Sequence, residues 1–173
     1  MTAPRIYVAC LAAYNNGRLH GAWIDAAQSV ENIWSEVQAM LKASPEPGAE
    51  EGAIHDYEGF GELRLSEWES FERVSAIGAG IDEHGDAFSA WLSYDDSQDA
   101  NDTQAFEDAY QGEWDSMRAY AENYAGDVGM YDAAEKTGFA YVRVDVDALA
   151  RDLDIEMYSV ESNHHTVYVF DPR

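Results

Sequence analysis

The chain has 173 residues, of which 34 are acidic and ten are basic, and its formal net charge at pH 7 is −24. This balance argues against direct binding to DNA, RNA or an anionic membrane, because such binding needs a basic surface. With 46% hydrophobic residues but no run of 18 apolar ones, the sequence predicts a folded globular protein without a transmembrane helix.

The N-terminus leads directly into the apolar alternation of a strand. It lacks the basic region, long apolar run and small-residue cleavage site of a secretory signal. The single cysteine, Cys10, lies within this alternation, where a thiol is expected to act as a small buried hydrophobe in a reducing compartment. We therefore expect a cytoplasmic protein.

The first predicted elements are two strands and a helix. Residues 5–14 alternate as in a strand, Asn16 and Gly17 are typical of a tight turn, and residues 19–25 resemble a second strand, which together predict a hairpin. Ser29 is the expected N-cap of a following amphipathic helix. The apolar positions of this helix are Val30, Ile33, Trp34, Val37, Met40 and Leu41.

Two prolines, Pro45 and Pro47, end the helix, and residues 53–57 are predicted to add a third strand to this α+β unit. The glycine-rich stretch 59–61 then marks a boundary. Beyond it, Ser66 and Glu69 have the spacing of a capping box. The apolar positions expected on the helix that they introduce are Trp68, Phe71, Val74 and Ile77.

Short helices are predicted for residues 86–94, 103–111 and 116–126, each with an Asp, Ser or Thr available as a cap. The C-terminal third is predicted to contain a strand and a further helix. These elements cover residues 139–145 and 146–153, and a closing hairpin follows at 155–160 with 166–170.

These elements predict an α+β fold, arranged as an elongated chain of small domains in which α/β ends flank an acidic helical middle. The predicted domains are an N-terminal α+β domain, an acidic helical middle domain and a C-terminal α+β domain. They cover residues 1–60, 61–102 and 103–173.

The negative charge is concentrated between Glu46 and Glu135. This stretch has 24 acidic and three basic residues, a net charge of −21. Between Arg73 and Arg118 there are eleven carboxylates and no lysine or arginine. Acidic runs are often disordered, but the many aromatic residues of this stretch predict that it folds.

A folded stretch of this size rivals duplex DNA in charge. A compact body of about 90 residues has a radius of gyration near 12 Å and hence a length of about 30 Å. Duplex DNA has about 18 charges over that length. Because such a density of like charge weakens a fold, we expect it to serve a function.

Enzymatic and metal sites are disfavoured by the residues themselves. Paired carboxylates could act as the acid and base of a glycosidase. With 34 acidic residues, however, close pairs arise by chance and none stands out. Asp95, Ser97 and Asp99 begin a calcium-loop pattern, but Ala100 and Phe106 replace its required glycine and its bidentate glutamate.

The histidines do not form a metal motif either. His164 and His165 adjoin the expected C-terminal turn, while His20, His55 and His84 are scattered along the chain. No nucleophile elbow, phosphate-binding glycine loop or cysteine pair is present in the sequence. We expect neither a metal nor a cofactor, and no catalytic residues.

Four segments together resemble the ArdA antirestriction family. They are Tyr14–Ile24 (YNNGRLHGAWI), Ala53–Phe60 (AIHDYEGF), Phe106–Trp114 (FEDAYQGEW) and Val144–Leu153 (VDVDALARDL), and they follow one another in the family's order. The resemblance covers nearly the whole chain. It implies an elongated homodimer, encoded on mobile genetic elements, that mimics DNA and inhibits type I restriction–modification enzymes without catalysis.

The sequence hypothesis is therefore a mimic of duplex DNA that occupies the DNA cleft of such an enzyme. Two alternatives remain: an acidic module that binds another basic protein, such as a nucleoid protein, and a hydrolase that uses buried acids. In the mimic, carboxylates stand where phosphates stand. The candidates are Glu67, Glu69, Glu72, Asp82, Glu83, Asp86, Asp95, Asp96, Asp99, Asp102, Glu107, Asp108, Glu113 and Asp115.

Overall fold

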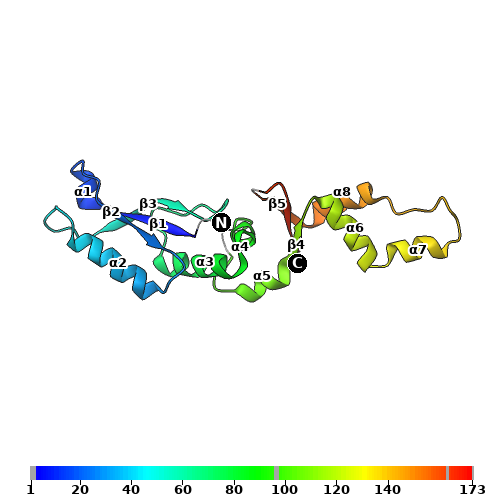
Figure 1. Cartoon of the computed structure of the whole chain (residues 1–173), viewed down its shortest axis with the longest axis horizontal. Helices are drawn as coiled ribbons and strands as arrows, with labels where there is room; N and C mark the ends of the chain where they lie inside the picture. The colour runs from blue at the N-terminus through cyan, green and yellow to red at the C-terminus, as the bar shows by residue number, and fades with distance from the viewer. Residues whose placement is uncertain (1–2, 96–97, 163, 173) are drawn as a thin grey trace. The chain divides into compact units, whose positions relative to one another are not determined.

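The computed structural model describes residues 3–95, 98–162 and 164–172 (Figure 1). The chain divides into two compact units, Met1–Thr103 and Gln104–Arg173. Each unit has its own three-stranded antiparallel sheet with helices, so the predicted α+β fold class is confirmed. The division into three domains at residues 60 and 102 stays a prediction.

The first sheet has the order β2-β1-β3. Its central strand β1 (Arg5–Cys10) pairs antiparallel with β2 (Gly21–Asp25) and with β3 (Gly52–Glu58). The sequence predicts the three strands and the pairing of the first two, but not the pairing of β1 with β3. Ile6 and Val8 of β1 are completely buried, which explains the apolar alternation of this strand.

The connection between β1 and β2 differs from the predicted tight hairpin. Residues Leu11–Asn15 form a short helix, α1, and the strand ends at Cys10. Ala13 of α1 is completely buried. Gly17 has a φ of 73° and follows the helix end, where a left-handed residue terminates a helix. The Asn-Gly signal therefore marks a helix end. The antiparallel pairing of the predicted hairpin is confirmed, but the tight turn expected at Asn16 and Gly17 was wrong.

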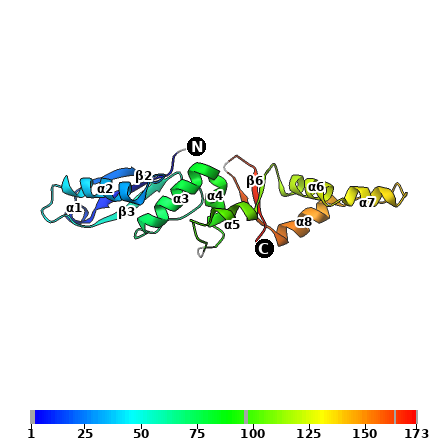
Figure 2. The same ribbon diagram turned by 90° about the horizontal axis from the view of Figure 1, so that it is seen from below.

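The predicted helix after Ser29 is confirmed as α2 (Val30–Lys42), and the Ser29 side chain accepts a hydrogen bond from the backbone N–H of Asn32. This helix packs against β1 and β2 (Figures 1 and 2). Its apolar positions Ile33 and Val37 are buried, whereas Trp34 is 45% exposed and lies edge-on to Phe71.

The next helix, α3 (Phe71–His84), begins later than predicted. Its N-cap is Ser70, whose hydroxyl accepts from the backbone N–H of Arg73. Ser66 instead caps a separate turn by accepting from the N–H of Trp68, so the predicted capping box was wrong. Trp68 therefore precedes the helix, and its side chain is 66% exposed.

Close packing sets the position of α3. A Cβ on Gly78 would stand 2.4 Å from the backbone of Ala26, and one on Gly80 would stand 2.2 Å from the ring of Phe88. Phe88 lies on α4 (Asp86–Leu92) and is completely buried. Glycine at these two positions thus brings α3 against the end of β2 and against α4.

The second unit is built on a sheet of order β4-β6-β5. Its strands are β4 (Tyr110–Trp114), β5 (Tyr158–Glu161) and β6 (Val167–Phe170), and the predicted closing hairpin is confirmed by the β5–β6 pairing. Strand β4 was not predicted. The helix expected for residues 103–111 ends at Ala109 as α5 (Thr103–Ala109), and the chain then enters the sheet.

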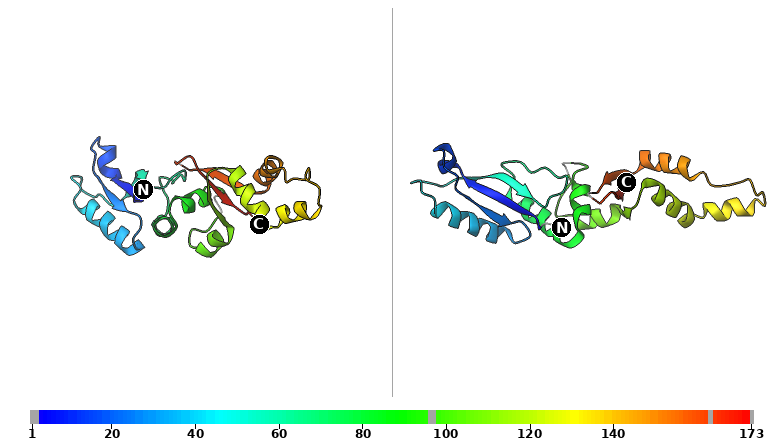
Figure 3. Two further views of the ribbon diagram at one scale, coloured as in Figure 1. Left: turned by 45° about the vertical axis from the view of Figure 1, so that its right-hand side comes forward. Right: turned by 45° about the horizontal axis from the view of Figure 1, so that its top comes forward.

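Helices α6 (Met117–Asp127) and α8 (Val146–Glu156) pack on each other and on this sheet (Figure 3). Both correspond to predicted helices. The core between them is centred on Tyr120, Leu153 and Val169.

The segment between these helices differs most from prediction. It contains α7 (Met130–Lys136), which was not predicted, and a loop in place of the strand expected at residues 139–145. Phe139 and Tyr141 are 57% and 77% exposed, and their rings stack on each other. The alternation of apolar residues was misleading because no strand pairs with this segment in the described residues. None of the helices in the described part of the chain is long and apolar enough to cross a membrane.

Candidate acidic interaction surface

The candidate carboxylates that the structure describes lie at the surface. Glu69 and Asp86 are half-buried, and Asp96 lies outside the described residues. The others are exposed: Glu67, Glu72, Asp82, Glu83, Asp95, Asp99, Asp102, Glu107, Asp108, Glu113 and Asp115. Because these carboxylates are exposed, the folded protein does not bear the cost of burying unpaired charges, and a partner can reach them directly.

Helix α3 carries three of the candidates. Glu72 and Glu83 are eleven residues apart, which is close to three helical turns, so both project from the face opposite the buried Ile77. At 1.5 Å per residue their backbones are about 17 Å apart along the axis. Asp82 lies nearer the edge of this face. The helix thus spaces charge along a rigid element.

Some of the candidates lie beside basic side chains. Glu69 lies 3.8 Å from the guanidinium of Arg73. Glu67 lies 3.5 Å from the imidazole of His55 and Glu83 lies 3.9 Å from that of His84, and these imidazoles are cationic only when protonated. Other arginines pair with carboxylates outside the candidate set: Arg5 with Glu58, Arg18 with Glu46, and Arg118 with Glu122 and Asp147.

The loop after α4 holds Asp99 in a defined place. Its carboxylate accepts hydrogen bonds of 2.9 Å from the backbone N–H and from the side-chain amide of Asn101. These bonds, the backbone one above all, lower the pKa of Asp99 below its ordinary value, and Arg73 adds to the effect. Arg73 also donates to the carbonyl of Gln98 and so ties this loop to α3.

In the second unit, α5 and β4 present the remaining candidates. Phe106 is buried and stacks on Tyr110, while its neighbours Glu107 and Asp108 on α5 remain exposed. Glu113 on β4 accepts a hydrogen bond from the hydroxyl of Thr166. Burial, followed by the negative charge of Glu113, raises the pKa of Tyr110.

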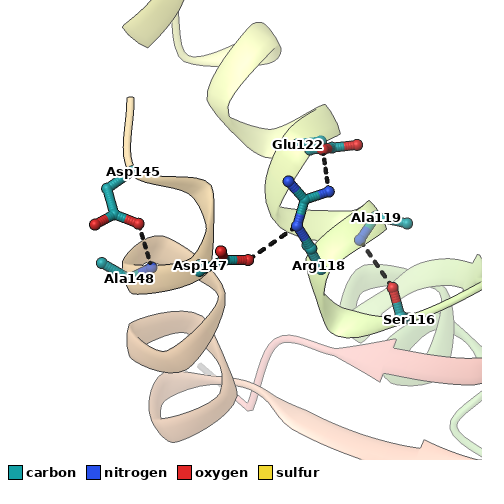
Figure 4. Close-up of polar contacts among 7 residues, drawn as sticks. All are labelled: Ser116, Arg118, Ala119, Glu122, Asp145, Asp147 and Ala148. Atoms are coloured by element: carbon teal, nitrogen blue, oxygen red, sulfur yellow. Dashed lines mark hydrogen bonds and ion pairs between the residues drawn. The ribbon is translucent and has the colours of Figure 1, made fainter. Parts of the chain in front are cut away.

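Sequence reasoning missed a charged cluster in the second unit. Arg118 on α6 donates to Glu122 on the same helix and, at 2.9 Å, to Asp147 on α8 (Figure 4). Both carboxylates raise the pKa of Arg118, the hydrogen bond to Asp147 most strongly. The spacing of Arg118 and Glu122 by four residues was a readable signal. The Asp147 contact depends on the packing of α6 against α8.

The charge is distributed unevenly within each unit. Residues 1–45 contain three acidic and three basic residues, whereas residues 46–103 contain 16 acidic and two basic residues, a net charge of −14. In the second unit, residues 128–144 contain two acidic and two basic residues. The other residues of that unit have a net charge of −10.

Within the described ranges, no three His, Cys, Asp or Glu side chains converge in an arrangement that could hold a metal ion. Ser97, part of the incomplete calcium pattern, lies outside these ranges.

Comparison with protein families gives a match along nearly the whole chain. Residues 6–168 match the model of the family described as antirestriction protein (ArdA). A comparison with curated proteins gives no match. The family match spans both compact units and the candidate carboxylates of each. The chain therefore belongs to the ArdA family of antirestriction proteins.

Proposed function

We propose that this antirestriction protein mimics duplex DNA and competitively occupies the DNA-binding cleft of a type I restriction–modification enzyme. Membership of the ArdA family supports antirestriction activity and a restriction–modification enzyme as the partner. The proposal goes beyond family membership in two respects: the protein mimics DNA, and the partner is a type I enzyme.

The density of exposed carboxylates is the observation that carries the mimicry. A compact unit of 103 residues has a radius of gyration of about 13 Å and a diameter of about 33 Å, a length over which duplex DNA carries about 19 charges. The net charge of the first unit is −14. For the second unit the corresponding estimate is about 17 duplex charges, and its net charge is −10. Each unit therefore carries more than half the charge of an equal length of duplex.

The mechanism follows from how enzymes hold DNA. Lysine and arginine side chains in a DNA cleft bind phosphate oxygens without reading sequence. A carboxylate offers the same side chains an anionic oxygen acceptor. Exposed carboxylates on α3 and α5 would thus replace phosphates in the cleft and exclude the substrate. In this proposal the protein performs no chemistry of its own.

We further propose that the protein acts as a homodimer that associates through residues 128–144. This segment has no net charge and contains no buried residue among those described. Val128, Tyr131, Phe139 and Tyr141 are all more than 40% exposed. Figures 1 and 3 show α7 and the following loop extending beyond the α6–α8 pair. A second copy would cover these apolar side chains without bringing two acidic surfaces together.

A mutational series tests mimicry against catalysis. If inhibition depends on the combined electrostatic field of many carboxylates, each single substitution should weaken inhibition by only a few-fold, since an exposed ion pair contributes about 0.2–1 kcal/mol. The single variants are Glu72→Gln, Asp82→Asn, Glu107→Gln and Asp108→Asn. A combined variant of six candidates should lose affinity roughly in proportion to the charge removed. The measurement is protection of target DNA from cleavage by a type I enzyme.

Circular dichroism in the far and near ultraviolet must remain unchanged across the series, so that unfolding is not mistaken for lost binding. A single substitution that abolishes inhibition while its neighbours have no effect would contradict the proposal. That pattern is typical of a catalytic acid.

A further inference from the structure

A pocket of about 230 Å³ opens on the first unit beside the start of α3. Its walls come from α2, from the edge strand β3 and from the turn that precedes α3. Trp34 and Phe71, whose rings are in contact, line it together with Ile54 of β3. Trp68, Glu67 and Glu72 also line the pocket.

The surroundings fix the walls of this pocket. The backbone N–H of Ile54 donates to the carbonyl of Glu67, which attaches the turn to the open edge of β3. The rings of Trp34 and Phe71 are 4.7 Å apart and perpendicular. These contacts place two tryptophans with 45% and 66% exposure around one cavity.

Two groups at the pocket are available to a ligand. In the described part of the chain, no hydrogen bond or ion pair engages the carboxylate of Glu72, and no hydrogen bond or ring contact engages the indole of Trp68. Trp23, another partly exposed tryptophan of the same unit, already has a cationic partner. The guanidinium of Arg5 already lies 4.9 Å from the centre of its ring.

The charge at the pocket favours a cation. Glu67, Glu69 and Glu72 line it, and the start of α3 and Arg73 oppose them. A helix N-terminus is equivalent to about half a positive charge. Three carboxylates exceed the helix end and one arginine together, and they still do so when His55, which lies 3.5 Å from Glu67, is protonated. The pocket therefore remains negative. Tryptophan faces attract cations, and they attract arginine most often among side chains.

We propose that this pocket binds an arginine side chain of the restriction–modification enzyme, with the guanidinium on Trp68 and its charge beside Glu72. This inference rests on the proposed function, because it requires a basic protein partner. The pocket would add one specific contact to the combined electrostatic attraction of the carboxylates. Interface energy is often concentrated in a few Trp, Tyr and Arg side chains that lose their contact with water when the complex forms.

The size of the pocket agrees with one side chain. Pockets for drug-sized ligands begin at about 300 Å³, and this one is smaller. The space is large enough to hold several water molecules. An arginine stem would replace them along the apolar wall while its head reaches the carboxylates.

A direct test titrates the intact protein with the peptide acetyl-Gly-Arg-Gly-amide and follows the tryptophan indole N–H signals by NMR. Controls are the same peptide with citrulline, which lacks the positive charge, and with leucine. We expect a saturable shift of the Trp34 and Trp68 signals with the arginine peptide, and no shift of Trp23. The controls should shift these signals several-fold less.

Three results would overturn the proposal. Absence of a saturable shift at Trp34 and Trp68 would show that the pocket does not take arginine. Equal shifts with the leucine peptide would make it a general apolar pocket. A shift of Trp68 with protein concentration alone would assign it to a second copy of the chain.

Substitutions connect the pocket to inhibition. We expect Trp68→Ala to weaken binding to a type I enzyme about tenfold and Trp68→Leu by several-fold, because leucine retains apolar area but not the π face. Trp68→Phe should retain most of the affinity. Trp23→Ala is the matched control and should leave affinity unchanged, with circular dichroism confirming the fold of each variant.

The results separate this inference from the function on which it rests. If Trp68 variants inhibit like the parent while the six-carboxylate variant fails, the pocket assignment is wrong and mimicry stands. If the six-carboxylate variant still inhibits, mimicry is wrong, and the peptide titration still decides whether the pocket takes arginine.

Discussion

Residues 46–103 and residues 128–144 are opposite kinds of surface on one chain. The first stretch has a net charge of −14 and spreads exposed carboxylates over α3 and its flanking loops. The second has no net charge and exposes Phe139 and Tyr141, two aromatic residues that stack on each other.

In the proposed function the two surfaces meet different partners. A dense field of carboxylates repels a second copy of itself and attracts a basic cleft. An apolar neutral segment has no such repulsion and gains from being covered. We therefore expect substitutions and solution conditions to affect the two surfaces independently.

Salt should give the largest difference between them. Binding that replaces phosphate contacts should weaken by about 10³-fold between 50 and 200 mM salt, near the lower end for six phosphate contacts. Self-association through residues 128–144 should hardly change, because apolar burial is not screened. Titration with a type I enzyme and light scattering of the protein alone, over the same salt series, check this. Enzyme affinity that is flat with salt would indicate apolar docking instead.

A charge placed in the neutral segment should break the dimer. We expect Phe139→Asp with Tyr141→Asp to weaken self-association by about 100-fold, because two aromatic contacts are lost and like charges face each other. Sedimentation equilibrium measures the change. The control is Leu19→Asp, since Leu19 is 90% exposed in the first unit and should leave the mass unchanged. A parent protein that is monomeric at micromolar concentration would contradict the homodimer but not single-subunit mimicry.

A matched pair of double variants tests whether the position of charge matters. Glu72→Gln with Glu83→Gln removes two carboxylates from the outer face of α3. Glu31→Gln with Glu36→Gln removes two exposed ones from α2, in the neutral N-terminal stretch. The α3 pair should lower enzyme affinity by about two- to 30-fold, on the scale of two ion pairs, and the α2 pair by less. Equal losses would show that net charge alone governs binding.

Asp99 gives the smallest effect. Its lowered pKa means that it stays ionised to lower pH than an unperturbed aspartate, and the folded state gains from this above the unfolded pKa. The gain disappears as the pH falls through the folded pKa. Asn101→Ala removes the side-chain hydrogen bond but retains the stronger backbone one. An NMR titration should therefore show the pKa of Asp99 rising only part of the way, and an unchanged pKa would contradict this account.

Local sequence signals predicted much of the fold. Ser29, the spacing of Ile33 and Val37 and the alternation of β1 are determined by neighbours in sequence, and each was confirmed. The failures depended on tertiary structure. Residues 139–145 alternate like a strand but have no strand partner in the described structure, and β4 forms because β6, more than 50 residues away, pairs with it.

The sequence predicted that the candidate site consists of exposed carboxylates, but it did not predict how the residues around the pocket come together. Exposure of the carboxylates follows from their place outside the apolar stripes. The pocket was not predictable, because Trp34 was expected in the core and Trp68 on the apolar face of a helix. Only the meeting of α2, β3 and the turn before α3 places these two residues around one cavity.

Competition between the protein and DNA tests the central claim most directly. The protein is titrated into the type I enzyme in a series of experiments, each with a higher fixed concentration of a short duplex that binds the enzyme. Each titration gives the apparent dissociation constant of the protein. If the two occupy one cleft, the apparent constant rises linearly with duplex concentration and without a plateau. A plateau, or no change, would show that protein and duplex bind together, and would contradict the account of this ArdA protein as a mimic of DNA.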